Sequence, residues 1–230
     1  MKSQPFPLKI LNILSILLFL AALAMVFLYA PLEVTMNYVQ KIFYFHIANA
    51  WVGMLGFLVA AVAGVLYLVH HDLKWDIIEL AAVEISLVFF LITIISGSIW
   101  ARPTWGTYWT WEPRLTTAAI LEMVYIACLL LRQGIDDPDR RARFSAVYTL
   151  IGSISVPITF FSIRLFRTIH PVLIGAASTS SQGSFDMTPK MLVTMLFVLG
   201  AFSVIFVTLF WHRIRLGQLI QLVEQQKLEE

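Results

Sequence analysis

Apolar residues fill the chain in six long, nearly unbroken segments that short polar stretches separate. A membrane-spanning helix needs about 20 consecutive apolar residues, and each segment is close to that length. Their bounds are roughly Leu8–Ala30, Phe43–Val69, Ile77–Ala101, Leu115–Leu131, Phe144–Ser162 and Met191–Trp211. The segments are continuously apolar and do not alternate, which excludes a transmembrane β-barrel. The pattern predicts an all-α integral membrane protein, a six-transmembrane-helix bundle that forms a single domain over residues 1–230.

The first apolar segment follows Lys2 and Lys9, as the core of a signal peptide would. Signal-peptide cores are about 7–15 residues long, whereas this run has about 20. We therefore expect an uncleaved first span. The polar tail after the last segment, residues 217–230, is expected to continue that helix beyond the membrane.

Composition supports a membrane protein. Hydrophobic residues make up 59% of the 230 residues and charged residues 13%, against about 45–50% and about 25% in soluble domains. Cys128 is the sole cysteine, so the chain can form no internal disulfide and has no CxxC motif. Its place inside an apolar segment predicts a small core residue.

Lysine and arginine placement predicts the orientation, because cytoplasmic loops carry the excess of these residues. With the N-terminus inside, ten of the 16 basic residues face the cytoplasm: Lys2, Lys9, Lys74, Arg132, Arg140, Arg141, Arg143, Arg213, Arg215 and Lys227. Both termini are then cytoplasmic. The outer face then carries His46, His170 and the stretch from about 102 to 115. The cytoplasmic side carries His70, His71 and His212.

The outer stretch from about 102 to 115 is dense in tryptophan. Tryptophan and tyrosine gather at membrane interfaces in general, so an interfacial belt is the simplest interpretation. The density favours an ordered platform for a flat ligand, between Pro103 and Pro113, which restrict the backbone. If the stretch were helical, four residues would share one face: Trp105, Tyr108, Trp109 and Glu112.

His46 and His170 could ligate a metal together. Haem iron accepts imidazole at its axial positions, whereas a zinc or copper site lacks a third ligand at a recognisable spacing. Arginine binds carboxylates in a two-pronged geometry and could hold the haem propionates, with contact to lipid headgroups as the alternative. The outer arginines are Arg102, Arg114, Arg164 and Arg167.

Three residues inside the spans are unusual for a membrane. Glu84 and Glu122 lie well within the third and fourth segments. Buried acids are costly in a bilayer, and we expect each to form an interhelical hydrogen bond. Pro157 should kink the fifth segment. The chain has no phosphate-binding glycine loop, no CxxCH haem-attachment motif and no familiar nucleophile–base pair, so any use of ATP would belong to a partner.

The run Trp105-Gly-Thr-Tyr-Trp-Thr-Trp-Glu-Pro-Arg-Leu-Thr116 resembles the WGxxWxWD signature, the WWD motif of membrane haem-handling proteins. The six-span layout is similar to the haem exporter protein C (CcmC) family of cytochrome c-type biogenesis. Two further stretches resemble that family's histidine segments. They are Lys41-Ile-Phe-Tyr-Phe-His46 with Ala50-Trp51, and Val156-Pro157-Ile158, Phe161-Ser162 and Thr168-Ile169-His170-Pro171.

The resemblance implies a haem transfer protein of the bacterial cytoplasmic (inner) membrane, not an enzyme. Haem b would bind non-covalently and transiently at the outer face, with His46 and His170 as axial ligands. The implied contacts are Trp105, Tyr108, Trp109, Trp111, Glu112, Arg114, Arg102, Arg164 and Arg167. Haem would pass to a membrane-anchored haem chaperone, beside an ABC-type transporter complex. The chain departs from the signature at Glu112, where Asp is usual, and at Leu165-Phe166, where two Trp are frequent.

Three alternatives remain open. The larger cytochrome c synthetases carry more spans and a sizeable outer domain, for which this chain has no room. A cofactor-free membrane scaffold would use its tryptophan loop only at the interface. A di-haem or quinone-reactive electron-transfer enzyme would place histidine pairs inside facing helices, whereas His46 and His170 lie at helix ends. The outer segment 172–188 is rich in Ser and Gly and could be a lid or a partner surface.

Overall fold

The computed structural model describes residues 4–171 and 187–229. Six helical stretches in this part of the chain are long and apolar enough to cross a membrane, which confirms the predicted spans. The helices are α1 (Phe6–Ala24), α2 (Lys41–His70), α3 (Leu73–Trp105), α4 (Pro113–Gln133), α5 (Pro138–Gly152), α6 (Ser155–Leu165) and α7 (Pro189–Glu229). A π-helical turn, Met25–Tyr29, extends α1, and a 3-10 turn, Tyr38–Gln40, precedes α2. Most of the segment 172–188 lies outside the described residues.

Local sequence signals set the helix ends. The Asp72, Glu112 and Asp137 side chains accept backbone N–H groups at the starts of α3, α4 and α5, which satisfies donors that lack an intrahelical partner. The helix α3 stops at Gly106, whose φ of 77° is the left-handed conformation that glycine adopts at no steric cost. The residue His71 ends α2 with a left-handed φ of 53°.

The fifth span is broken, as Pro157 predicts. The break lies at Ser153 and Ile154, between α5 and α6. A proline inside a helix lacks the N–H that would bond four residues back, and its ring clashes with that carbonyl. For Pro157 the carbonyl in question is that of Ser153, so the break lies one turn before the proline.

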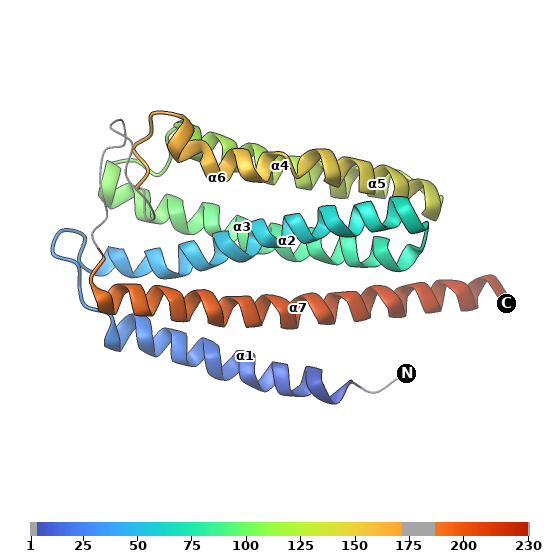
Figure 1. Cartoon of the computed structure of the whole chain (residues 1–230), viewed down its shortest axis with the longest axis horizontal. Helices are drawn as coiled ribbons and strands as arrows, with labels where there is room; N and C mark the ends of the chain where they lie inside the picture. Colours follow the sequence, from blue (N-terminus) through green and yellow to red (C-terminus); the bar gives the residue numbers. More distant parts are fainter. Residues whose placement is uncertain (1–3, 172–186, 230) are drawn as a thin grey trace.

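The helices pack in layers (Figure 1). The helices α2 and α3 form the centre, α4, α5 and α6 cover one side, and α7 covers the other with α1 outside it. Two apolar clusters hold the layers together. One joins α1, α2, α3 and α7 around Tyr44 and Phe202. The other joins α2, α3 and α4, where the Phe57 and Tyr125 rings stack with centroids 3.9 Å apart.

Buried polar groups make specific contacts between the helices. The Arg132 guanidinium of α4 binds both carboxylate oxygens of Asp76 on α3, at 2.5 and 2.9 Å. Glu84 forms an ion pair with Arg213 of α7, so the expected contact between helices is present for this residue. For Glu122 the expected bond stays a prediction: its buried Oε2 atom has no hydrogen-bond partner among the described residues. Cys128 is fully buried, as predicted.

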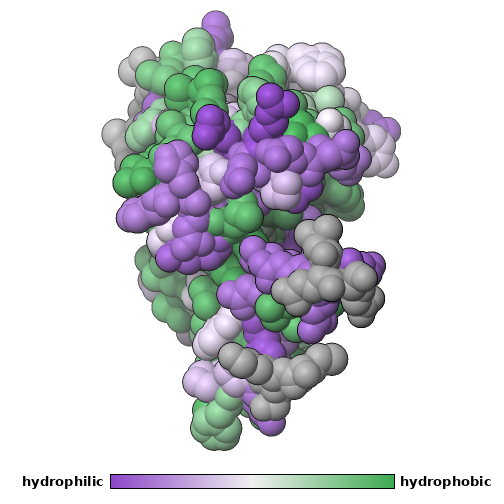
Figure 2. Space-filling model, turned by 90° about the vertical axis from the view of Figure 1, so that its right-hand side faces the viewer, coloured by the Kyte–Doolittle hydropathy of each residue, from purple (hydrophilic) through white to green (hydrophobic). Residues whose placement is uncertain are grey.

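The two ends of the bundle differ in character. Both termini lie at one end, together with the α2–α3 and α4–α5 turns (Figure 1). Figure 2 shows hydrophilic side chains gathered on that end. The helix α7 continues through the polar tail to Glu229, which confirms the predicted extension of the last span. The tryptophan-rich loop and the chain after α6 lie together at the opposite end. Which end faces the cytoplasm stays a prediction.

Candidate functional site

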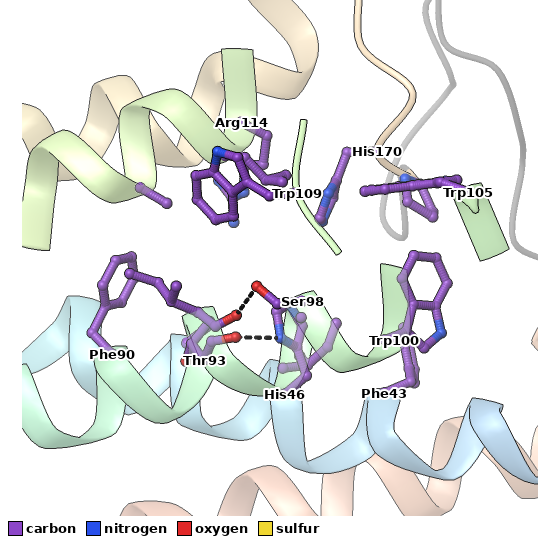
Figure 3. Close-up of a pocket in the computed structure, with 17 residues that line it drawn as sticks. Phe43, His46, Phe90, Thr93, Ser98, Trp100, Trp105, Trp109, Arg114 and His170 are labelled. Carbon is purple, nitrogen blue, oxygen red and sulfur yellow. Dashed lines mark hydrogen bonds between the residues drawn. The ribbon is translucent and has the colours of Figure 1, made fainter. Parts of the chain in front are cut away.

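A pocket lies between the central helices and the layer above them, near the tryptophan-loop end (Figure 3). Its cavity volume is about 80 Å³. Two rows of side chains face each other across it. The first row comes from α2 and α3 and includes Phe43, His46, Phe90, Thr93 and Trp100. The second includes Trp105, Trp109, Arg114 and His170. The pocket is therefore a slot with one histidine on each wall.

His46 lies in the second turn of α2, and its ring contacts α3. Its Nδ1 atom is 3.0 Å from the carbonyl oxygen of Thr93 (Figure 3). The same atom is 3.3 Å from the Ser96 hydroxyl. A carbonyl oxygen can only accept, so the proton of the neutral ring belongs on Nδ1. The Nε2 atom then keeps its lone pair. In metal-binding histidines a hydrogen bond from the nitrogen that does not bind the metal fixes the tautomer and the ring orientation.

His170 belongs to the short segment that follows α6. Its backbone N–H donates to the Thr168 hydroxyl oxygen at 3.0 Å, and the Thr168 hydroxyl donates to the Glu112 carboxylate. Burial, the nearby Arg114 guanidinium and His46 together hold the pKa of His170 well below its ordinary value. The ring is therefore neutral at neutral pH. Its buried Nδ1 atom has no partner among the described residues.

The two imidazoles suit a single shared metal ion. Their ring centroids are 6.5 Å apart. An ion bound by one nitrogen of each ring at the roughly 2 Å usual for metal–imidazole bonds would set the centroids about 6 Å apart. No group of three His, Cys, Asp or Glu residues in the described ranges could hold a metal ion. The pair therefore fits a metal that brings its other ligands with it, as porphyrin iron does.

Aromatic rings flank the histidine pair. The Trp105 ring lies edge-on to His170 at 6.0 Å and edge-on to Trp100 at 5.4 Å. Trp109 and Arg114 lie on the other side of His170 along the slot (Figure 3). The indole nitrogens of Trp100 and Trp109 are buried without a partner among the described residues. The pocket thus offers flat apolar surfaces to a flat ligand.

The tryptophan-rich loop differs from the helical arrangement considered in the sequence. Helix α3 runs through Pro103 to Trp105 and stops, and residues 106–112 are not helical. The four residues named for one helical face therefore separate. Trp105 and Trp109 line the pocket, whereas Tyr108 is exposed, with the Arg102 guanidinium 5.6 Å from its ring. The Glu112 carboxylate accepts the Leu115 N–H at 2.9 Å and caps α4.

The four outer arginines also separate. Arg114 lines the pocket, and its guanidinium donates to the carbonyl oxygen of Thr159 on α6. It forms no ion pair with an acid in the part of the chain that the structure describes, so its charge is available to an anion in the slot. Arg102, Arg164 and Arg167 are exposed and do not line the pocket. Trp111 is also outside the slot, with 76% of its surface exposed.

Sequence reasoning missed one wall of the pocket. Thr93, Gly97 and Trp100 line it from α3, at spacings of four and three residues that place them on one helix face. The spacing alone does not single these residues out, because the third apolar segment is apolar on every face. Phe43 and Phe90 complete the wall and are indistinguishable by sequence from ordinary core residues.

Comparisons with known proteins agree along nearly the whole chain. The family model "Heme exporter protein C" matches residues 4–229, which include both histidines and the tryptophan-rich loop. "Heme exporter protein C" from Bradyrhizobium diazoefficiens is 36% identical over 180 residues, 78% of this chain and 67% of the relative. The protein of that name from Escherichia coli K12 is 30% identical over 199 residues, 86% and 78%. A "Putative cytochrome c biosynthesis ccmC-like mitochondrial protein" from Marchantia polymorpha is 28% identical over 173 residues, 75% and 71%.

Proposed function

Because the chain belongs to the heme exporter protein C family, we propose that it binds haem between His46 and His170 and transfers it during cytochrome c maturation. The family comprises membrane transport proteins, so the chain is not an enzyme. Its role within the family is haem transport for cytochrome c biogenesis. The binding site and the hand-over of haem to a partner are our proposal.

The observation that carries the proposal is the histidine pair. The two imidazoles come from distant parts of the sequence, stand on opposite walls of one slot and are 6.5 Å apart. Each imidazole can bind a metal in its neutral form. His46 carries its proton on Nδ1, which bonds the Thr93 carbonyl oxygen, and the pKa of His170 lies well below its ordinary value. A haem in the slot would have one histidine on each face of its ring, as axial ligands are placed.

The remaining pocket residues suit the rest of the ligand. The Trp105 and Trp109 rings would contact the porphyrin, and Arg114 would bind a propionate, because a guanidinium matches a carboxylate in two parallel hydrogen bonds. Five of the expected contacts lie outside the slot and could touch haem only where it protrudes. They are Tyr108, Trp111, Arg102, Arg164 and Arg167. Glu112 would act indirectly, through Thr168 and the position of His170.

We propose that haem is handed on from this slot to an acceptor. A haem held by its iron would leave part of its rim outside, where an acceptor could reach it. We propose that the acceptor is a membrane-anchored haem chaperone, that an ABC-type transporter works alongside, and that the site faces outward from the bacterial inner membrane. The lysine and arginine distribution supports this orientation.

Haem retention in purified variants tests the proposal. His46→Ala and His170→Ala should each lower the haem retained after detergent purification, because each removes one iron ligand. His212→Ala is the matched control, since this histidine bonds Asn12 at the other end of the bundle and should retain haem as the wild type does. Equal retention in all three variants would contradict the pocket assignment. It would favour the alternative of a cofactor-free scaffold.

A further inference from the structure

His46 approaches α3 unusually closely. Its Nδ1 atom bonds the Thr93 carbonyl oxygen, which belongs to an uninterrupted stretch of α3. In a helix such a carbonyl already accepts the N–H four residues later, which here is that of Gly97. The imidazole therefore reaches the Thr93 oxygen beside the Gly97 backbone, at a point where a side chain on residue 97 would stand.

Gly97 provides the space for that contact. A Cβ atom on residue 97 would lie 2.8 Å from His46 Cε1 and 3.2 Å from its Nδ1. Carbon atoms in contact are normally about 3.5–4.0 Å apart. The ring would have to move away from α3, and the hydrogen bond to Thr93 would lengthen or break.

The glycine has no conformational reason to be there. Among the described residues Gly106 is the glycine with a positive φ, so residue 97 has an ordinary helical backbone that alanine adopts more readily. A glycine inside a helix lowers helix stability, and it leaves room for a neighbouring group to approach the backbone closely. The atom that approaches Gly97 most closely is the Cε1 carbon between the two nitrogens of the His46 ring.

We propose that Gly97 is a positioning residue for His46: it lets the imidazole lie flat enough on α3 to keep its proton on Nδ1 and its Nε2 free for iron. This inference rests on the proposed role of His46 as a haem ligand. The proposed role of Gly97 concerns only the wall of the slot that carries His46. Ser96 is a secondary partner, because its hydroxyl lies 3.3 Å from Nδ1 and also donates to the Thr93 oxygen.

Gly97→Ala tests the proposal by haem titration of the full-length protein in detergent. When a metal-binding residue loses its hydrogen-bond partner, metal affinity typically falls about 10–100-fold. We expect the haem affinity of Gly97→Ala to fall in that range and its Soret band to change. The chain should still fold, because the three atoms nearest to the added methyl group all belong to the His46 ring, a single side chain that can move. Gly200→Ala is the matched control, since a Cβ there meets nothing within 4 Å.

The His46→Ala background separates positioning from a general effect on the pocket. If Gly97 acts through His46, adding Gly97→Ala to His46→Ala should change haem affinity no further. A further loss as large as that in the wild-type background would overturn the proposal. If His46→Ala itself leaves haem binding unchanged, the proposed function fails. If only Gly97→Ala leaves it unchanged, this inference alone fails.

The tautomer can be measured without haem. Nitrogen-15 NMR of histidine-labelled protein, with the His46 signal assigned from the His46→Ala variant, should show Nδ1 protonated in the wild type. In Gly97→Ala this signature should be lost or mixed with the Nε2–H form. A wild-type ring protonated on Nε2, or a signature identical in Gly97→Ala, would contradict the proposed role of Gly97 whatever the haem titration shows.

Discussion

At the scale of single residues, the pocket separates side chains that the tryptophan-rich motif places next to one another. Trp109 and Arg114 line the slot, while Glu112, between them in sequence, caps α4 and accepts the Thr168 hydroxyl. The acid of the motif thus joins two chain segments that frame the pocket. Its contribution should be to the position of His170 and not to direct contact with a ligand.

Glu112→Ala should lower both thermal stability and haem affinity, because it removes a helix cap of about 1 kcal/mol and the anchor of Thr168. Asp137→Ala is the matched control. Asp137 caps α5 by accepting the Arg140 N–H at 2.7 Å, at the end of the bundle away from the pocket. Asp137→Ala should lower thermal stability about as much as Glu112→Ala does and should leave haem affinity unchanged. Melting curves and haem titrations would distinguish them, and equal haem affinities would argue against an anchor role for Glu112.

Arg114 should bind one haem propionate, because its guanidinium lines the slot without a carboxylate partner among the described residues. Arg114→Ala should weaken haem binding by about 10-fold or more, since hydrogen bonds to charged groups contribute about 1.5–3 kcal/mol. Arg141→Ala, at the opposite end, should have no effect. Equal haem dissociation constants for the two variants would remove the propionate role.

At the scale of the helices, sequence predicted where spans lie but not which faces meet. About 20 apolar residues are enough to identify a span, and Pro157 predicted the interruption of the fifth. Helices that are apolar all round carry no stripe to show their packing face, so the wall of Thr93, Gly97 and Trp100 was not foreseen. The end of α3 was also unforeseen, because Pro103 lies inside the helix and Gly106 ends it.

The buried pair between α3 and α4 should hold these helices together at the end away from the pocket. Arg132→Met would leave the Asp76 carboxylate buried without its partner, which typically costs about 3–5 kcal/mol. A double variant with Asp76→Leu should regain much of that loss. Thermal unfolding in detergent measures the stability of both variants. A double variant no more stable than Arg132→Met would show that the pair is not the source of the loss.

At the scale of the whole molecule, the fold brings His46 and His170 to one slot although a large part of the sequence separates them. Sequence placed both on one face of the membrane through the count of spans between them. It could not show that they share a pocket, because that depends on how α4 and α6 lie over α2 and α3. The membrane orientation stays a prediction, which rests on lysine and arginine placement alone.

Cysteine labelling in intact cells would test that orientation. In a Cys128→Ser background, Trp111→Cys should react with a membrane-impermeant thiol reagent added outside. Arg143→Cys should react only after the membrane is opened, because both positions are exposed and belong to segments at opposite ends of the bundle, the loop before α4 and the first turns of α5 (Figure 1). The reverse pattern would place the pocket on the cytoplasmic side.

The most direct test of the account is the absorption spectrum of the detergent-purified protein titrated with haem, wild type beside the His46→Ala/His170→Ala double variant. We predict a Soret band in the wild type with the form expected of histidine-ligated haem, and its loss or shift in the double variant. Identical spectra for the two proteins, or no Soret band in the wild type at any haem concentration, would contradict a haem site between the two histidines.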